Sequence, residues 1–330
     1  MQGYRTDMED AHHVTLSLKS HPNLTYIGVF DGHNGTAAAE WMAENMQLRL
    51  SELTDPTNHK ELAAAVEKAD ADFMADASVR VHGTTACLAL ISTSPSDPSQ
   101  RKLTCASVGD SRCLVIDAEG KVKFTTVDHK PETDSEGDRI RSAGGFVSNG
   151  RVDGDLAMSR SIGDHTYKTS PNLGPLDQKV IPTPDCADVT LEPTDMVLVC
   201  CDGLVERLTN EQVAQFVHEQ VTAQQKSGDV DPAMVVAALL DHSLLKGSKD
   251  NMSAALLLPM EGSNYGRADE YRVGPFSEWS NDRSFVEAFF TDAKKHGYNQ
   301  EQVMALVQQS KEQQQSTASA IAEKKNAILL

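Results

Sequence analysis

Residues 84–116 read TTACLALISTSPSDPSQRKLTCASVGDSRCLVI, and the class of the fold can be inferred from them. It holds three apolar runs, at 84–91, 102–108 and 112–116, that are rich in valine, isoleucine, leucine and cysteine. Short runs of this kind, separated by Gly, Pro, Asp and Ser, predict β-strands. Because the runs are continuous rather than alternating, both faces of the sheet should be covered by other layers.

The rest of the chain supplies more strands and the helices to cover them. Further apolar runs lie at 24–30, 195–201 and 252–258. The short segment DAEG at 117–120 predicts that neighbouring strands between 84 and 126 pair as antiparallel hairpins. Helical periodicity predicts two pairs of helices, at 35–52, 60–76, 210–225 and 232–246. The pattern predicts a layered α+β fold.

Segment 165–190 is rich in proline and lacks periodicity, so we expect an irregular surface segment there.

The pattern changes after Pro259. Segment 263–281 resembles a connector, and Asn299 with Gln302 predicts a capping box at the start of a final helix. We therefore expect a catalytic domain over 1–262 and a non-catalytic helical extension over 263–330.

Composition excludes several classes of protein. The 330 residues carry a formal net charge of -18, from 48 acidic and 30 basic residues, so we expect neither nucleic acid nor an anionic membrane as partner. No segment approaches the roughly 18 consecutive apolar residues of a membrane span. The six cysteines form no CxxC pair, which predicts reduced thiols in the cytosol or the nucleus. We expect a monomer.

Four aspartates lie where an apolar run meets a Gly or Asn turn: Asp31, Asp110, Asp202 and Asp250. At any one site, Asp-Gly is also good turn chemistry. A carboxylate beside a dry interior is costly unless it is paired or bound to metal, and four coincide here. Oxygen ligands without a His or Cys cluster favour Mg²⁺ or Mn²⁺ over zinc. Glu9 and Asp10 add two further acidic groups.

Seven segments, in this order, carry a family resemblance: QGYRTDMEDAH at 2–12, GVFDGHNG at 28–35, HGTTAC at 82–87, ASVGDSR at 106–112, DGDLAMSRSIGD at 153–164, VCCDGL at 199–204 and SKDNMS at 248–253. The chain resembles the type 2C, metal-dependent serine/threonine protein phosphatases over nearly all of residues 1–259. The resemblance implies a central antiparallel β-sandwich flanked by helix pairs on both outer faces, in α-β-β-α layers, with the metals at one end.

The resemblance also implies a metal-ligand set. Asp31 matches a carboxylate that bridges two metals, and the backbone carbonyl of Gly32 matches a further ligand. Glu9 matches a ligand of one metal, and Asp202 and Asp250 match ligands of the other. Behind these ligands, the resemblance implies supporting roles for Asp10, Thr85 and Asn251.

Three more residues receive roles from the resemblance. Asp110 matches a residue that can hold a weaker third metal. Arg5 is expected to bind phosphate, since its guanidinium can donate two parallel hydrogen bonds. His33 is expected to protonate the departing alkoxide as a general acid.

The sequence departs from the family pattern at two places. Glu206 stands where the family usually has an aspartate, four residues after Asp202, which puts the affinity for a third metal in doubt. Family members also have a strand before the QG segment, and this sequence starts at Met1 within that motif. We expect either a truncated start or a missing edge strand.

The implied activity is hydrolysis of phosphoserine and phosphothreonine in phosphoproteins, by a water activated at a binuclear Mn²⁺ or Mg²⁺ centre and without a phosphoenzyme intermediate. One alternative is a pseudophosphatase or scaffold, although every core ligand is present. Another is metal-assisted phosphoryl chemistry on small molecules or nucleotides. The sequence has no GxxxxGK[ST] loop and no HRD to DFG series, which argues against a nucleotide-triphosphatase or a kinase.

Overall fold

The computed structural model describes residues 1–94, 96–97, 100–228, 230–258, 283–295 and 297–308. The strands are β1 (Ala11–Thr15), β2 (Leu24–Phe30), β3 (Gly32–His33), β4 (Gly83–Thr84), β5 (Ala86–Thr93), β6 (Arg101–Val108), β7 (Arg112–Ile116), β8 (Val122–Thr125), β9 (Val147–Ser148), β10 (Arg151–Val152), β11 (Ile162–Gly163), β12 (Asp185–Leu191), β13 (Met196–Cys200) and β14 (Ala254–Leu257). The helices are α1 (Ala37–Glu52), α2 (His59–Met74), α3 (Asp134–Ser142), α4 (Asp202–Val205), α5 (Asn210–Ser227), α6 (Pro232–Leu245) and α7 (Arg283–Lys295), with short 3-10 turns at Ala77–Val79 and His165–Tyr167. A further helix covers 300–308, and Asn299 and Gln302 form the predicted capping box at its start.

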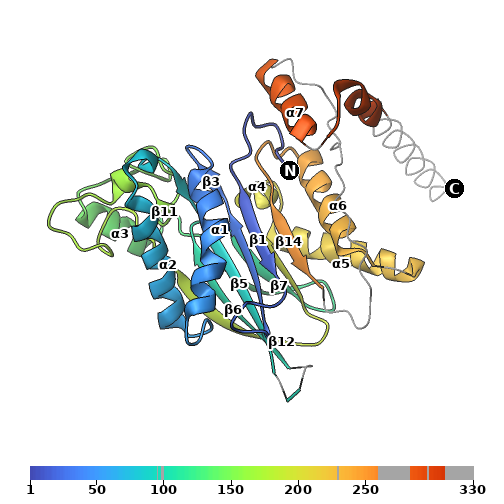
Figure 1. The fold of residues 1–330 in the computed structure, drawn as a ribbon, viewed down its shortest axis with the longest axis horizontal. Coiled ribbons are helices and arrows are strands. Elements are labelled where there is room, and N and C mark those ends of the chain that lie inside the picture. Colours follow the sequence, from blue (N-terminus) through green and yellow to red (C-terminus); the bar gives the residue numbers. More distant parts are fainter. Residues whose placement is uncertain (95, 98–99, 229, 259–282, 296, 309–330) are drawn as a thin grey trace.

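Two antiparallel sheets form the centre of the fold (Figure 1). One has the strand order β1-β2-β5-β6-β12 and the other β14-β13-β7-β8. The predicted hairpins β5/β6 and β7/β8 are confirmed. The predicted pairing of β6 with its neighbour β7 is wrong, because these two strands belong to different sheets. The chain crosses between the sheets at Gly109, whose φ of 96° is readily adopted by glycine.

Three apolar clusters hold these elements together. One joins α1 and α2 to the five-stranded sheet, through residues such as Met42, Met46, Leu62, Leu88 and Leu90. A second joins the two sheets, through residues such as Val29, Cys87, Leu103, Val115 and Val199. The third joins α5 and α6 to the four-stranded sheet, through residues such as Leu114, Leu198, Val213, Val217 and Leu239. Figure 1 shows the two helix pairs on opposite sides of the sheets, and the α+β class is confirmed.

Among the elements that were not predicted from the sequence are β1, α3 and β12. β1 and β12 lie at the two edges of the five-stranded sheet and are only partly buried, so they lack the continuous apolar signal of β5 and β6. In α3, Ile140 is the only large apolar side chain, and the rest of DSEGDRIRS is small or charged. Its position depends on ion pairs with other segments, which a local pattern does not reveal.

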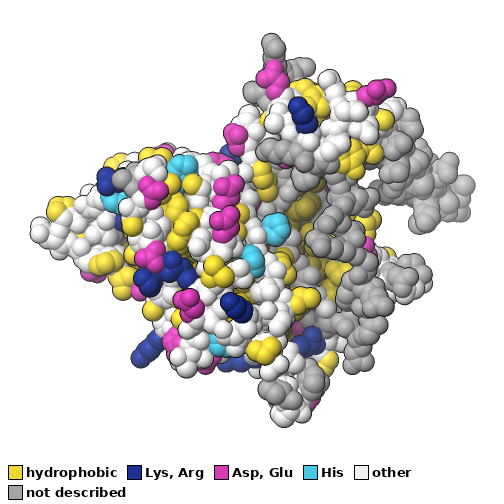
Figure 2. Space-filling view, viewed as in Figure 1, with side chains coloured by type: hydrophobic (Ala, Val, Ile, Leu, Met, Phe, Trp, Pro, Cys, Tyr) yellow, Lys and Arg dark blue, Asp and Glu magenta, His cyan; other side chains and the backbone are white. Residues whose placement is uncertain are grey.

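The surface carries both signs of charge. On the face drawn in Figure 2, acidic and basic side chains are interspersed with scattered apolar ones among the residues shown in colour. Within the described parts of the chain, no helix has the length and apolar character needed to cross a bilayer. At the C-terminal side, Val286 and Phe289 of α7 pack against Leu244 and Met252, together with Tyr4.

Candidate metal centre

Four strand ends bring the predicted aspartates to one place. Asp31 follows β2, Asp110 follows β6, Asp202 follows β13 by one residue, and Asp250 lies shortly before β14. Carboxylate oxygens of Asp10 and Asp31 and the sulfur of Cys201 all lie within 4.8 Å of one another. The two sheets therefore contribute acidic groups to a single centre between them.

The carboxylates of this centre repel one another. Burial, followed by repulsion from Asp10, Asp202, Asp110 and Asp250, raises the pKa of Asp31 well above its ordinary value. Burial and the charges of Asp110 and Asp250 raise the pKa of Asp202 to about 7. Such shifts mean that the folded chain opposes full ionisation of the cluster unless positive charge is added.

A hard divalent cation fits this donor set. Among the described residues, no lysine or arginine forms an ion pair with Asp10, Asp31 or Asp202. Asp10 Oδ2 and Asp110 Oδ1 are buried and have no hydrogen-bond partner. Buried carboxylate oxygens without partners are costly, and Mg²⁺ and Mn²⁺ prefer oxygen ligands of this type.

Cys201 is a neighbour of this centre that the sequence analysis missed. Burial and the charges of Asp10 and Asp31 raise the pKa of its thiol well above the ordinary value. Its sulfur also accepts a hydrogen bond from the backbone N–H of Ser253 at 3.1 Å. In the metal-free chain, burial therefore favours the protonated thiol over the thiolate. In the sequence, the position of Cys201 directly before Asp202 could have indicated that it lies beside the centre.

Backbone contacts hold the strand ends in register. Thr85 Oγ1 accepts a hydrogen bond from the Asp31 N–H at 3.1 Å, and the Thr85 N–H donates to the Asp31 carbonyl at 2.9 Å. Gly32 packs so tightly that a Cβ there would lie 2.3 Å from the Glu9 carbonyl oxygen. A larger residue at position 32 would push the Glu9 segment away from Asp31.

Asn251 connects the N-terminal segment to Asp250. Its Oδ1 accepts from the Glu9 N–H at 2.9 Å, while its Nδ2 donates to the carbonyls of Gln2 and Asp7 at 2.8 and 2.9 Å. The Asn251 N–H donates to Asp250 Oδ1 at 2.7 Å. The structure thus places Thr85 and Asn251 where they fix the backbone of the predicted ligands, and their supporting roles stay predictions.

Arg5 and Glu9 lie at the same centre. Arg5 Nη2 is 2.8 Å from Asp250 Oδ2, and 57% of the Arg5 side chain is exposed. Glu9 Oε1 accepts a hydrogen bond from the Gly35 N–H. Arg5 is therefore within reach of solvent and tied to a predicted ligand through one of its nitrogens.

His33 has a buried partner that the sequence analysis did not assign. His33 Nε2 lies 2.8 Å from Asp164 Oδ2, and Ser161 Oγ donates to the same oxygen at 2.6 Å. Gly83 makes room for the pair, because a Cβ there would lie 2.2 Å from Asp164 Oδ2. Burial lowers the pKa of His33, but the hydrogen bond and charge of Asp164 raise it more, above its ordinary value. His33 Nδ1 is buried and has no hydrogen-bond partner.

A lysine also reaches the centre. Lys130 Nζ lies 2.5 Å from Asp110 Oδ2 and 3.9 Å from Asp128 Oδ2. Burial lowers the pKa of Lys130, but the charges of Asp110, Asp128 and Asp202 raise it above its ordinary value. No local sequence pattern singles out this lysine, because its role depends on the contact with Asp110.

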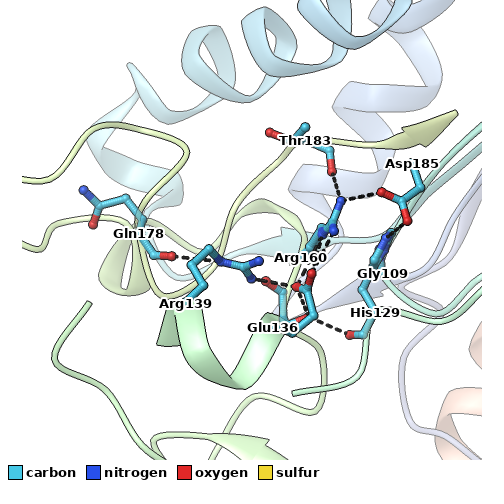
Figure 3. Close-up of polar contacts among 9 residues, drawn as sticks. Gly109, His129, Glu136, Arg139, Arg160, Gln178, Thr183 and Asp185 are labelled. Carbon is cyan, nitrogen blue, oxygen red and sulfur yellow. Dashed lines mark hydrogen bonds and ion pairs between the residues drawn. The ribbon is translucent and has the colours of Figure 1, made fainter. Parts of the chain in front are cut away.

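An ion-pair network connects α3 to this side of the centre (Figure 3). The buried carboxylate of Glu136 lies 2.7 Å from Arg160 and 2.8 Å from Arg139. Arg160 also forms an ion pair with Asp185, whose Oδ2 lies 3.3 Å from His129 Nε2. Burial raises the pKa of Glu136, but hydrogen bonds from Arg160, Arg139 and Ser159 outweigh it and lower the pKa to about 2.

Comparison with known proteins identifies relatives of the chain. A family model described as "Protein phosphatase 2C" matches residues 1–252. Protein phosphatase 2C homolog 2 of Hypocrea jecorina is 34% identical over 272 residues, which cover 78% of this chain and 60% of that relative. Protein phosphatase 1A of Homo sapiens is 33% identical over 277 residues, which cover 78% of this chain and 68% of that relative. The chain thus spans less than two thirds of the Hypocrea protein.

Solved structures give a similar result. The chain superposes on the crystal structure of a phosphatase from a pathogenic strain of Toxoplasma gondii with a TM-score of 0.68 and 28% sequence identity. The superposition covers 78% of this chain and 89% of that one.

Proposed function

Because the chain belongs to the protein phosphatase 2C family, we propose that it hydrolyses phosphoserine and phosphothreonine in proteins at the centre around Asp31 and Asp202. One observation carries the proposal: Asp10, Asp31 and Asp202 are gathered at the sheet ends, and among the described residues no lysine or arginine forms an ion pair with them. Phosphate monoesters are dianions, and their hydrolysis is extremely slow without a catalyst. A centre that binds divalent cations would offset the negative charge of the phosphate and accelerate its hydrolysis.

The residues around the centre would hold two divalent cations. Asp31 would contribute to both sites, as the family resemblance implies. Glu9 and the Gly32 carbonyl would complete one site, and Asp202 and Asp250 the other. Bound Mn²⁺ or Mg²⁺ would supply Lewis acidity and lower the pKa of a water for attack on phosphorus. The raised pKa values of Asp31 and Asp202 support this assignment, since added positive charge relieves their repulsion.

The chain's own residues bind the phosphate and move a proton. Arg5 is more than half exposed and uses one nitrogen for Asp250, so its other donors can bind phosphate oxygens. His33 would donate a proton to the serine or threonine oxygen as the P–O bond breaks, while Asp164 engages its Nε2. Asp164 acts through His33 by fixing the orientation of its ring.

We also infer that the sheets and helix pairs stack as α-β-β-α layers, which the three apolar clusters support. The partners would be phosphoproteins, and the working form a monomer. Six free cysteines support a reducing compartment, the cytosol or the nucleus.

A substrate panel tests the substrate class. With Mn²⁺ present, the full chain should release phosphate from phosphoserine and phosphothreonine peptides with higher kcat/KM than from free phosphoamino acids or nucleotides. A preference for the small substrates would support the alternative of small-molecule phosphoryl chemistry. No turnover on any substrate would support a scaffold instead, and Arg5→Ala is the matched variant for phosphate binding.

A further inference from the structure

Lys130 brings a fixed positive charge to one end of the acidic centre. Its ammonium lies 2.5 Å from Asp110 Oδ2, and the Asp110 side chain is only 3% exposed. The other oxygen, Asp110 Oδ1, is buried without a hydrogen-bond partner. Asp110 is thus neutralised from one side by a residue of the chain itself, which distinguishes it from Asp31 and Asp202.

The backbone around Lys130 is tied to the turn that carries Asp110, through His129 and Gly109, which Figure 3 labels. The Gly109 N–H donates to His129 Nδ1 at 3.1 Å, and the His129 N–H donates to the Gly109 carbonyl at 2.9 Å. Ser159 Oγ donates to the His129 carbonyl at 3.0 Å. These reciprocal bonds fix the two segments relative to each other, so the ammonium is positioned by the fold.

The residue before His129 is fixed as well. Arg112 Nε and Nη2 donate to the two carboxylate oxygens of Asp128 at 2.8 and 2.9 Å. Asp128 is therefore neutralised by Arg112, and at 3.9 Å it competes only weakly for Lys130. The strong partner of Lys130 is Asp110.

Glu206 is engaged away from Asp110. Its carboxylate pairs with Arg207 at 3.0 Å and accepts a hydrogen bond from Ser248 Oγ at 3.3 Å. A third cation at Asp110 and Asp202 would have to draw Glu206 away from these partners, or do without it. It would also face the ammonium of Lys130 at close range, and like charges a few Å apart in a partly buried site repel strongly.

We propose that Lys130 takes the place of a third divalent cation at Asp110, so that the chain binds two ions tightly and has no tight third site. The inference rests on the proposed two-ion centre. The fixed ammonium supplies positive charge at Asp110 at any metal concentration. The ammonium of Lys130 therefore disfavours the binding of a third metal ion at Asp110.

Metal stoichiometry tests this inference without an activity assay. Mn²⁺ binding to the metal-stripped full chain is measured by calorimetry and by electron paramagnetic resonance, for the parent, Lys130→Met, Lys130→Gln and Lys130→Arg. The parent and Lys130→Arg should bind two ions tightly. The two neutral variants should bind a third ion at least about tenfold more tightly than the parent does, because the repulsion is gone. Asp110→Asn added to Lys130→Met should abolish the gained site.

Two results would overturn the inference. One is a third ion in the parent with an affinity like that of the first two, and the other is no gain in either neutral variant that circular dichroism shows to be folded. Fewer than two tight ions in all proteins would instead contradict the proposed two-ion centre, and the inference with it. The count of tight ions in the parent separates the two failures.

Discussion

His33 Nε2 lies 2.8 Å from Asp164 Oδ2, although the two residues are 131 positions apart in the sequence. Asp164 is almost fully buried, and its backbone lies in the left-handed region with a φ of 53°. The pair leaves His33 Nδ1 as the nitrogen without a partner. This arrangement suits a proton donor whose ring must keep one orientation.

The first prediction compares leaving groups. An alkoxide leaving from phosphothreonine is strongly basic and needs a proton, while nitrophenolate leaves without one. His33→Gln should therefore lose about 10² to 10⁴-fold in kcat on a phosphothreonine peptide, and much less on p-nitrophenyl phosphate. The comparison is made at saturating Mn²⁺, because His33 adjoins predicted ligands.

Asp164→Asn serves as the companion variant. It should show the same unequal loss, smaller in size, since the ring remains but its orientation is less fixed. An equal loss on both substrates, for both variants, would point to a role in holding the metals and would remove His33 as the general acid.

A second prediction concerns the central ligands. Asp31→Asn and Asp202→Asn should each remove nearly all turnover while the chain stays folded, because each variant loses a charge that binds metal and relieves repulsion in the metal-free centre. The metal-free Tm should be equal to or above that of the parent. Asp188→Asn, which weakens ion pairs with Lys102 and His59 but keeps an amide oxygen to accept the hydrogen bond from Thr104 Oγ1, is the matched control and should stay within a few-fold of the parent. Activity near the parent's in either ligand variant at saturating metal would show that the residue is no ligand.

The central strands could be predicted, and so could the position of Asp31 and Asp202 at strand ends, since long apolar runs end at these two residues. The edge strand β12 could not, because DCADVTL mixes charged and apolar residues and depends on pairing with β6. The contact of Lys130 with Asp110 and that of Asp164 with His33 depend on how distant segments meet. Local patterns carry little information about such contacts.

The third prediction is a pH dependence of stability. The pKa of Glu136 is lowered to about 2 in the folded chain, so its ion pairs stabilise the fold above the unfolded pKa and are lost as pH falls toward 2. Glu136→Gln should cost roughly 3 kcal/mol in the free energy of unfolding at pH 7. The cost should shrink by roughly 1 kcal/mol at pH 4, where the unfolded chain already binds the proton.

Urea unfolding of the metal-free chain at pH 7, 5 and 4 measures this cost. The exposed Glu119→Gln is the control, with little change at any pH. A cost for Glu136→Gln that is the same at all three pH values would mean that the carboxylate contributes packing rather than charge.

A fourth prediction concerns the C-terminal extension, 263–330, part of which lies outside the described residues. Truncation after residue 262 should keep turnover within a few-fold, because every predicted ligand precedes it. The truncated chain should lose roughly 1 to 3 kcal/mol of stability, since Val286 and Phe289 cover Leu244 and Met252. Phe289→Ala in the full chain should reproduce part of that loss. If a soluble, metal-loaded truncation had no turnover, the extension would be part of the catalytic unit.

The last prediction is that turnover requires a divalent metal ion. The full chain is stripped of metal, and phosphate release from a phosphothreonine peptide is measured in chelator, then with Mn²⁺ or Mg²⁺ added, beside Asp202→Asn. We predict that stripping lowers turnover by on the order of 10³-fold or more and that either ion restores it in the parent but not in the variant. Undiminished turnover of the stripped parent in chelator would contradict the account.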